Sequence, residues 1–248
     1  MPKQHAIMPH RRAFLAAGGA LILGAALWPA RASAQTAAKM RIGVIGSGHI
    51  GGTIGALWIK DGHKVLFSSR HPEELKELVE GLGAAAQAGT VDQAIAFGDV
   101  LFIAVPYKAL PQIGQDYGAA LNGKIVLDAG NAVPARDGNE IFDEVEKNGI
   151  GVTSQKYLPG TRLVRAFNTL NYKIFASEAN RPDPKLAVPI AGDDAEAVQV
   201  AARLVSDAGF DPVVVGTLKD ASRFQRGAPG YGQSVSAAEL RQKLSLTP

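Results

Sequence analysis

Arg41-Ile-Gly-Val-Ile-Gly-Ser-Gly-His-Ile-Gly51 is the stretch that most narrowly restricts the architecture of this 248-residue chain. Its first five residues form a short β-branched run typical of a buried strand, and a G-x-G-x-x-G pattern follows at once over 46–51. The next residues predict a helix over 52–60, a turn over 61–63 and a second strand over 64–67. A glycine pattern between a strand and a helix, with a further strand behind it, is typical of a dinucleotide-binding unit.

Each glycine of this pattern has its own steric role. Gly46 permits a tight turn, Gly48 lets the backbone approach a pyrophosphate, and Gly51 lets the helix pack closely on the strand. The pyrophosphate would accept hydrogen bonds from unpaired amides at the helix N-terminus. A turn that binds nothing is the alternative, and the flanking strand and helix argue against it. The expected cofactor-binding residues here are Gly46, Ser47, Gly48, His49, Ile50 and Gly51.

The end of the second strand indicates which dinucleotide is bound. An NAD site needs a carboxylate there, about 20 residues past the glycines, to bind the ribose 2′-hydroxyl. This chain has Ser68, Ser69 and Arg70 at that place, and its next acid is Glu73. A carboxylate would repel a 2′-phosphate, whereas hydroxyls and a guanidinium bind it through charge-assisted hydrogen bonds. The sequence therefore favours NADP over NAD, with His71 either assisting or lying on the surface.

Apolar and helical segments alternate along the rest of the chain. Further strands are expected at 84–87, 100–105, 124–128, 164–167, 186–190 and 212–215, and helices at 72–81, 90–97, 193–208 and from 236 onward. This alternation predicts an α/β protein with a Rossmann-like, doubly wound and mostly parallel sheet. We expect an NADP-binding Rossmann domain over residues 40–167 and a small C-terminal α/β lobe over 168–248.

Residues 1–34 have the composition of an export signal. Basic residues without any acid precede an uncharged apolar run of 14 residues, Leu15–Trp28, and an Ala-x-Ala exit ends at Ala34. The run is too short and too rich in Ala and Gly to predict a permanent membrane span. The pair Arg11-Arg12 resembles the twin-arginine signal, with a plain Sec signal as the alternative. We expect the twin-arginine export machinery to carry the protein to the periplasm, with cleavage near Ala34.

Net charge alone would suggest a different partner. The chain has 26 Lys and Arg against 23 Asp and Glu, a formal charge of +3 and a pI near 9.1, values that fit nucleic acid binding. Four of the basic residues lie in 1–34, which contains no acid, so cleavage takes the formal charge to −1. Once residues 1–34 are removed, the net charge no longer suggests a nucleic acid partner. The absence of cysteine excludes a disulfide scaffold, thiolate-bound zinc, iron–sulfur clusters and cysteine nucleophiles.

Three loops are expected to form a ligand site, because open α/β sheets bind ligands beyond the carboxyl ends of their strands. The loops are Ala104-Val105-Pro106 after the fourth strand, Asp128–Asn131 after the fifth and Phe167–Thr169 after the sixth. Pro106 is expected to bring Tyr107 near the cofactor. Asn131 and Asn168 either bind the nicotinamide carboxamide or an acceptor, or they bond only loop backbone. Asp128 is expected to cap a turn rather than to transfer protons.

The residue types that are missing narrow the chemistry. The five histidines are at 5, 10, 49, 63 and 71, so none lies downstream as the acid–base partner of a hydroxy-acid dehydrogenase. No paired carboxylates and no metal-ligand spacing occur, and Lys173 near the third loop is of a type that is usually solvated. No catalytic residue and no metal site are therefore assigned. Hydride transfer between a nicotinamide and a flavin-like ring needs chiefly the alignment of two rings, which favours such an acceptor over a carbonyl.

Residues 40–248 resemble the NADP oxidoreductase family that includes the coenzyme F420-dependent NADP reductases. The matching segments are Met40–Gly51, Phe67–Arg70, Ala104–Pro106, Ile125–Asn131, Val164–Thr169 and Ile190–Asp194. The segment 166–169 is also similar to the cytosolic NADPH domain of six-transmembrane ferric reductases. The resemblance implies coenzyme F420 or a flavin as co-substrate, and an NADP site at Ser47, Gly48, His49, Ile50, Ser69, Arg70 and Pro106. This chain has Glu73, Glu74 and Leu75 before Lys76, where deazaflavin reductases place a basic residue.

These features predict an exported NADP-dependent oxidoreductase that transfers a hydride between NADP(H) and a flavin- or deazaflavin-type acceptor. Two alternatives stay open: a non-enzymatic NADP-binding redox sensor, and an imine or carbonyl reductase. Pyrroline-5-carboxylate reductases begin similarly but add a long helical dimerisation region, which residues 195–248 match poorly. The expected partners are NADP(H), a small redox acceptor and the export machinery, and a homodimer is left open.

Overall fold

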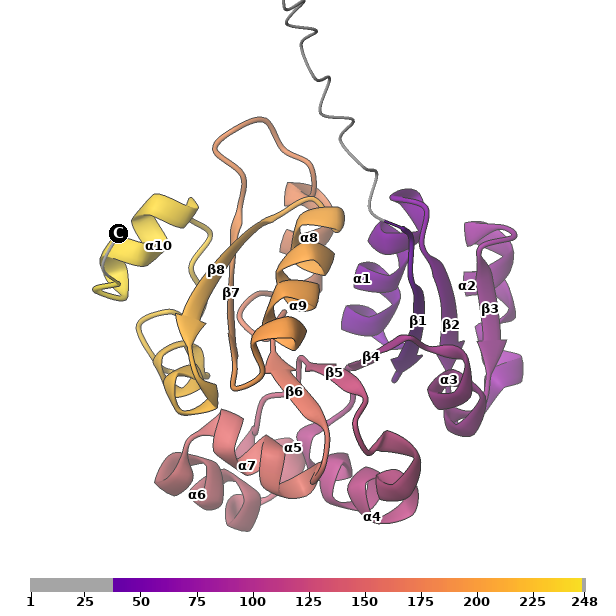
Figure 1. Cartoon of the computed structure of the whole chain (residues 1–248), viewed down its shortest axis with the longest axis horizontal. Coiled ribbons are helices and arrows are strands. Elements are labelled where there is room, and N and C mark those ends of the chain that lie inside the picture. The colour runs from indigo at the N-terminus through magenta and orange to yellow at the C-terminus, as the bar shows by residue number, and fades with distance from the viewer. Residues whose placement is uncertain (1–37, 247–248) are drawn as a thin grey trace, which may run out of the picture. The chain divides into compact units, whose positions relative to one another are not determined.

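Eight strands form one sheet in the order β3-β2-β1-β4-β5-β6-β7-β8 (Figure 1). They are β1 (Arg41–Ile45), β2 (Lys64–Ser68), β3 (Ala86–Gly89), β4 (Val100–Ile103), β5 (Ile125–Asp128), β6 (Arg162–Arg165), β7 (Ala187–Gly192) and β8 (Asp211–Gly216). Every neighbouring pair is parallel except β6 and β7, which are antiparallel. The strand order runs outward in both directions from β1 and β4, as in Rossmann folds. The predicted fold class is confirmed.

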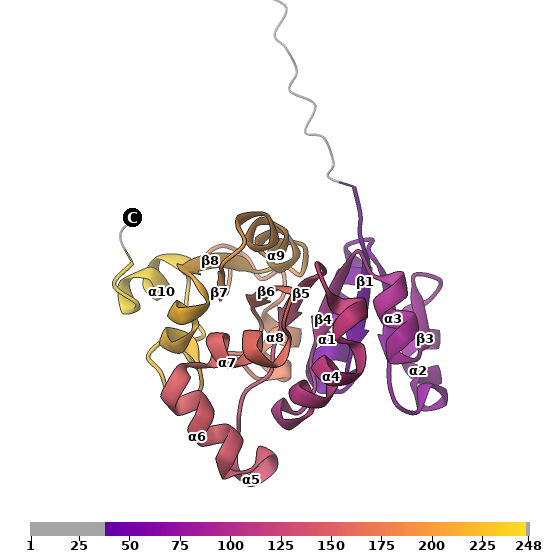
Figure 2. The ribbon, with the colours of Figure 1, turned by 60° about the horizontal axis from the view of Figure 1, so that its bottom comes forward.

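Ten α-helices and three 3-10 helices accompany the strands in the part of the chain that the structure describes. The helices are α1 (His49–Lys60), α2 (Lys76–Leu82), α3 (Val91–Phe97), α4 (Leu110–Leu121), α5 (Pro134–Asp137), α6 (Asn139–Asn148), α7 (Ile150–Tyr157), α8 (Tyr172–Glu178), α9 (Ala195–Asp207) and α10 (Ala237–Lys243). The 3-10 helices are η1 (Pro72–Leu75), η2 (Tyr107–Ala109) and η3 (Leu218–Phe224). β3 and α2 lie at one end of the sheet, and β8 and α10 lie at the other (Figure 2).

The computed structural model describes residues 38–246, which belong to one compact unit. The predicted export signal at 1–34 lies outside the described residues. The predicted domain boundary at residue 167 falls between β6 and α8, within this unit, and stays a prediction. Among residues 38–246, no helix is both long enough and apolar enough to cross a membrane.

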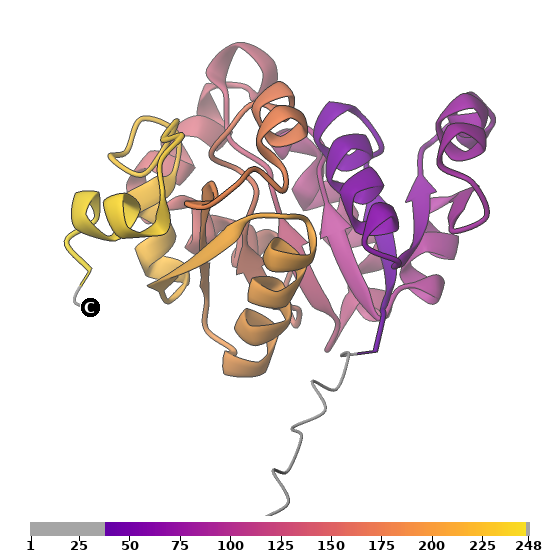
Figure 3. The ribbon, with the colours of Figure 1, turned by 90° about the horizontal axis from the view of Figure 1, so that it is seen from above.

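Apolar side chains fill a layer on each face of the sheet. On one face α1 and α9 lie side by side (Figure 3) and pack, with α8, around Trp58 and Phe167. The rings of Trp58 and Phe167 meet edge-on, with their centroids 5.8 Å apart. On the other face α4 and α7 cover the sheet through residues such as Leu110 and Ile150. Because both faces are covered, β4 and β5 are buried throughout, and for β4 the continuous apolar sequence predicts this.

Several helix starts follow directly from capping residues. The Thr90 hydroxyl accepts from the N–H of Gln93, whose side chain accepts from the Thr90 N–H, so the predicted capping box of α3 is confirmed. The Asp194 carboxylate likewise accepts from the N–H of Ala197 at the start of α9 (2.8 Å). The predicted strand at 164–167 ends early, at Arg165, because Phe167 has a φ of +59° and leaves the extended conformation. The helices α4 to α8 were not predicted.

Candidate functional site

The glycine loop and the start of α1 leave an open cradle at the end of β1. Gly46 has a φ of +95°, which favours glycine, and a Cβ on Gly51 would lie 2.0 Å from the Gly46 carbonyl oxygen. Gly48 is the N-cap of α1 and has no side chain to bond the first-turn amides. A Cβ on Gly48 would meet nothing within 4 Å. The first-turn N–H groups of α1 therefore have no side-chain cap, and the space beside Gly48 is open, a combination that suits a phosphate group.

The end of β2 presents a serine and an arginine beside this loop. Ser68 is fully buried and its hydroxyl donates to the Val44 carbonyl (2.8 Å), so it supports the strand. The Ser47 hydroxyl donates to the Ser68 carbonyl (3.0 Å) and ties the glycine loop to β2. The Ser69 hydroxyl accepts from the His71 N–H (3.0 Å) and keeps its own proton to donate. The exposed Arg70 has no partner for its guanidinium within residues 38–246.

A cavity of about 690 Å³ joins these groups. Among the residues lining it are Ile45, Gly46, Ser47, Gly48, Ser68, Ser69, Arg70, Ala104, Val105, Pro106 and Lys108. Glu74 and Asp116 also line it, so both charge signs are present. We call this space the first cavity.

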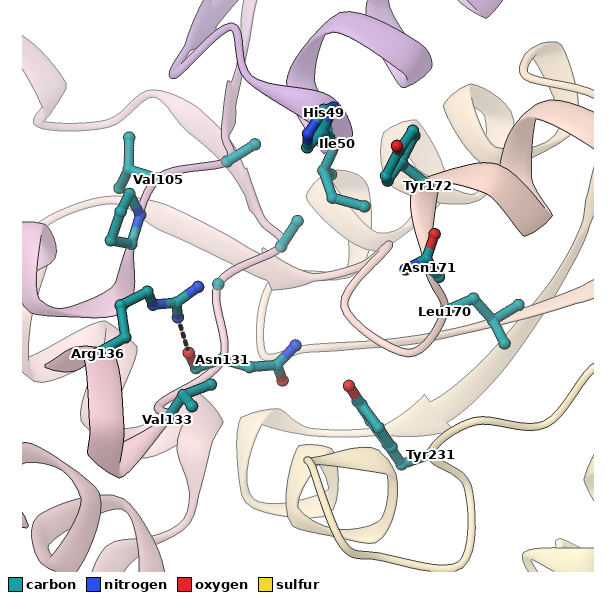
Figure 4. Close-up of a pocket in the computed structure, with 14 residues that line it drawn as sticks. His49, Ile50, Val105, Asn131, Val133, Arg136, Leu170, Asn171, Tyr172 and Tyr231 are labelled. Carbon is teal, nitrogen blue, oxygen red and sulfur yellow. Dashed lines mark hydrogen bonds between the residues drawn. The ribbon is translucent and has the colours of Figure 1, made fainter.

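A second cavity of about 550 Å³ lies beyond the carboxyl ends of β4 and β5 (Figure 4). It is lined by His49, Ile50, Ala104, Val105, Pro106, Ala129, Gly130, Asn131, Val133, Arg136, Leu170, Asn171, Tyr172 and Tyr231. Ala104, Val105 and Pro106 line both cavities, so the two spaces adjoin along this short segment. Together they follow the edge of the sheet at which Rossmann folds bind dinucleotides.

Two side chains from distant parts of the sequence form a wall of the second cavity. The rings of His49 and Tyr172 are stacked, with centroids 4.2 Å apart and planes inclined by 7°. His49 begins α1 and Tyr172 begins α8, so the stack joins the glycine loop to the chain that follows β6. In the view of Figure 4 these rings lie across the cavity from Arg136, and the Tyr231 hydroxyl points into the space.

Asn131 and Asn168 bond each other. The Asn131 Nδ2 donates to the backbone carbonyl of Asn168 (2.7 Å), and the Asn168 Nδ2 donates to the Asn131 Oδ1 (3.3 Å). Asn168 also donates to the Phe224 carbonyl (3.3 Å), and its own Oδ1 is buried without a partner. The two residues therefore bond loop groups, and only Asn131 lines a cavity. The left-handed backbone of Phe167 turns the chain so that Asn168 reaches Asn131.

A buried polar network supports the loop under the second cavity. The Arg165 guanidinium pairs with the Asp128 carboxylate and donates to the Gly130 carbonyl, and both side chains are fully buried. The Asp128 carboxylate also accepts from the Gly130 N–H (2.7 Å), which is the turn-capping role expected from the sequence. Asp128 and Arg165 are register partners on the adjacent strands β5 and β6, so the pairing follows from the sheet itself. The network thereby fixes both backbone groups of Gly130.

The expectation that Tyr107 lies beside the cofactor is wrong. Its side chain is fully buried on the other side of the loop, where its hydroxyl donates to the Ile150 carbonyl (3.2 Å) and bonds the Ser154 hydroxyl (2.9 Å). Burial raises the pKa of Tyr107 well above its ordinary value, so the hydroxyl stays protonated. Pro106 does line both cavities, but η2 turns the next side chain into the core.

A separate group of titratable side chains, Asp61, His63 and Asp207, lies at the opposite end of α1. The His63 Nδ1 accepts from the Met40 N–H (3.0 Å), so the ring proton is on Nε2, which donates to Asp207 (2.9 Å). In this tautomer Nε2 has no lone pair for a metal ion. The group therefore anchors the chain just before β1.

Comparison with known proteins shows which family the glycine loop and the end of β2 resemble. Residues 41–132 match the family NADP oxidoreductase, coenzyme F420-dependent. These residues contain the glycine loop, Ser69, Arg70 and the segment shared by the two cavities. Within residues 41–132 the chain therefore resembles NADP-dependent oxidoreductases.

Individual relatives agree with this class and with the fold. The chain is 27% identical over 184 residues to the metalloreductase STEAP3 of Rattus norvegicus; the match covers 73% of this chain and 35% of that protein. The chain thus spans about a third of that relative's length. The solved structure of protein SMa0349 from Sinorhizobium meliloti is 26% identical, with a TM-score of 0.68 over 80% of this chain and 96% of that one. A candidate F420-dependent NADP reductase from Arthrobacter sp. FB24, 22% identical, covers 74% and 87% with a TM-score of 0.62 and shares the fold.

Most residues predicted from the sequence meet at one of the two cavities. The first cavity collects Gly46, Ser47, Gly48, Ser68, Ser69 and Arg70; the second collects His49, Ile50 and Asn131; both share Ala104, Val105 and Pro106. Gly51 and Asn168 line neither. Contact of any of these residues with NADP stays a prediction. Sequence reasoning missed Arg136, Tyr172 and Tyr231, which belong to no local motif and reach the site only through the fold.

Proposed function

We propose that the protein is an exported oxidoreductase that transfers a hydride between NADP(H) and a flavin- or deazaflavin-type acceptor. The observation that carries the proposal is the junction of the two cavities along 104–106. A dinucleotide whose phosphates lie in the first cavity would extend past Pro106, so that its nicotinamide end enters the second. An acceptor in the second cavity would then lie against the reactive ring.

Residues of the first cavity fit NADP. The unpaired amides at the start of α1 would bind the pyrophosphate, and the open space at Gly48 leaves room for it. Arg70 and Ser69 would bind the 2′-phosphate, since both have donors that no other described group uses. Lys108 lines the same cavity and adds a second cation.

Residues of the second cavity fit a flat ring. The stacked rings of His49 and Tyr172 form one aromatic wall, and Ile50, Val133 and Leu170 supply apolar surface that excludes water. NADPH would transfer a hydride, which is one proton with two electrons. The products would be NADP⁺ and a reduced ring with one additional negative charge. These residues align two rings and shield them, which is the main requirement of such a transfer.

Export is the second part of the proposal and rests on residues 1–34 alone. The pair Arg11-Arg12, the apolar run and the Ala-x-Ala exit support a twin-arginine signal. Because that pathway carries folded proteins, NADP would bind before export and travel with the protein to the periplasm. Replacing both arginines by lysine should retain the protein in the cytoplasm, as measured by cell fractionation; unchanged export would favour a Sec signal.

The test of the activity is the rate of NADPH oxidation by purified protein with deazaflavin, FMN, FAD, a ferric chelate and a cyclic imine in turn. We expect turnover with the flavin-type acceptors. Turnover with the imine alone would favour an imine reductase. Tight NADPH binding without any turnover would favour a sensor.

The dinucleotide preference has its own test. Arg70→Gln should weaken NADPH binding roughly 10- to 100-fold and leave NADH binding nearly unchanged, because only NADPH carries the 2′-phosphate. Lys76→Gln is the matched control, since this exposed cation follows Arg70 closely but lines neither cavity. Equal losses for both nucleotides in the Arg70 variant would refute the assignment.

A further inference from the structure

Arg136 is the one Lys, Arg, Asp or Glu side chain that lines the second cavity in the described part of the chain. It belongs to the short helix α5, and its side chain is 46% exposed. Figure 4 shows the guanidinium directed into the cavity beside Asn131. The transfer of a hydride between two rings depends chiefly on their alignment, so this cation needs another explanation.

The guanidinium is held in a fixed orientation. Its Nε and Nη2 donate to the Asp137 carboxylate (3.1 and 2.8 Å), and Nη2 also donates to the Asn131 carbonyl (2.6 Å). The Asp137 carboxylate is buried and accepts further bonds from the N–H groups of Val133 (2.8 Å) and Lys108 (3.2 Å). Burial alone would raise the pKa of Asp137, but these hydrogen bonds hold it below its ordinary value. Asp137 therefore stays ionised and orients Arg136.

This anchoring leaves one edge of the guanidinium free. Nη1 carries two N–H donors, and no group among residues 38–246 accepts from them. The cavity thus combines a stacked aromatic wall, apolar lining and a preoriented cationic donor, a combination that suits an aromatic ligand bearing an anionic group.

We propose that the second cavity selects a planar redox acceptor that carries an anionic group, and that Nη1 of Arg136 binds this group. The inference rests on the proposed function, which places the acceptor in this cavity. It adds that the acceptor is anionic and that Arg136 binds its anionic group. A neutral imine or a free ferric ion has no anionic group to pair with Arg136.

FMN and riboflavin provide the test, because they share one ring system and differ by a phosphate. Each flavin is titrated into the purified protein saturated with NADP⁺, and binding is followed by the quenching of flavin fluorescence. NADP⁺ occupies the first cavity, so a flavin phosphate cannot bind there, and no turnover occurs. We expect FMN to bind at least about 10-fold more tightly than riboflavin.

Substitutions of Arg136 assign the preference to this residue. In Arg136→Gln the two flavins should bind within about threefold of each other, with the riboflavin affinity unchanged, whereas Arg136→Lys should retain part of the preference. Arg241→Gln, at an exposed arginine of α10 outside both cavities, is the matched control and should bind as the wild type does. The melting temperature and the NADP⁺ affinity of each variant establish that its fold is intact.

Several outcomes would overturn the inference. Equal binding of the two flavins to the wild-type protein would do so, and so would equal weakening of both in Arg136→Gln, which would indicate a merely structural role. In either case NADPH-driven flavin reduction would leave the proposed function standing. Selective FMN binding without reduction by NADPH would instead refute the proposed function and leave the charge selectivity intact. Absence of binding by both flavins would refute the inference, and NADPH oxidation with deazaflavin would then decide the proposed function separately.

Discussion

Arg165 supports the loop under the second cavity through a buried charge. It is fully buried on β6, and the Asp128 carboxylate on β5 is its ionic partner. Its guanidinium also donates to the Gly130 carbonyl, while its Nε is buried without a partner. A buried charge of this kind is costly unless it is paired, so each member of the pair depends on the other. The pair then holds the loop at 129–131, which lines the second cavity.

Removal of either partner should therefore cost more than removal of both. Arg165→Met leaves the Asp128 carboxylate buried and unpaired and should lower the free energy of unfolding by about 3–5 kcal/mol. The double variant Asp128→Asn/Arg165→Met should recover part of this loss, because the asparagine oxygen can still accept from the Gly130 N–H. Urea unfolding of the two single variants and the double variant measures the coupling. Additive losses would contradict the pairing argument.

In the first turn of α1, helix packing and the proposed ligand binding depend on different glycines. Gly51 is required for the close approach of α1 to the glycine loop, whereas Gly48 faces open space, where only a ligand would occupy the position of a side chain. Gly52 lies inside the helix, with its nearest potential neighbour 3.7 Å from an added Cβ. Three neighbouring glycines thus have three different tolerances for one methyl group.

Alanine substitutions at these three glycines should give three distinct results. Gly51→Ala should lower both the melting temperature and NADPH binding, because its Cβ would clash with the Gly46 carbonyl. Gly48→Ala should weaken NADPH binding at least about 10-fold with little change in melting temperature. Gly52→Ala should retain NADPH binding and raise the free energy of unfolding by up to about 1 kcal/mol, because alanine is favoured over glycine in a helix interior. Thermal melts and NADPH titrations measure the stability and the affinity of each variant. Unimpaired NADPH binding by Gly48→Ala would argue against a phosphate site at this loop.

Asp194 makes the start of α9 sensitive to acid. Hydrogen bonds from Arg162 and from the Ala197 N–H lower the pKa of its carboxyl from 3.8 to about 2. Because the pKa is lower in the folded than in the unfolded state, the stabilisation is complete above about pH 4 and is lost as the pH falls towards 2. Asp194→Asn keeps a cap for Ala197 but loses the ion pair with Arg162.

The wild-type protein should therefore melt at a higher temperature than Asp194→Asn at pH 6, and the difference should vanish as the pH approaches 2. Asp143→Asn, at an exposed residue of α6, is the control and should show no such convergence. A difference between the wild type and Asp194→Asn that is constant from pH 6 to pH 2.5 would show that the ion pair contributes nothing.

The elements that sequence reasoning found are those with strong local signals. The buried strand β4 is a continuous apolar run, β5 is apolar up to Asp128, and α3 and α9 begin at recognisable caps. The helix α4 was missed because two glycines, Gly114 and Gly118, weaken its helical pattern and its N-cap, Ala109, has no capping side chain. Its position depends on packing against the sheet. The site divides in the same way. A local motif contains the glycine loop and Arg70, whereas Arg136 and Tyr231 reach the second cavity only after β5 and η3 have been placed.

Trp58 connects the residues before and after position 167, where the sequence predicts a domain boundary. It is fully buried on α1, and its Nε1 donates to the Leu204 carbonyl on α9 (2.7 Å). Its ring also contacts Phe102 on β4 and Phe167 just after β6. Solvent cannot reach this junction without disruption of the core that covers one whole face of the sheet.

Unfolding of residues 38–246 should consequently be a single transition. Trp28 and Trp58 are the two tryptophans of the chain, so Trp28→Phe leaves Trp58 as the sole fluorescent reporter of the α1–α9 contact. Its fluorescence and the far-ultraviolet circular dichroism should change at the same urea concentration. NADPH at 100 times its Kd should stabilise the fold by about 2.7 kcal/mol and shift both curves together. An independent C-terminal lobe would instead expose Trp58 in a transition that is separate from the main loss of circular dichroism.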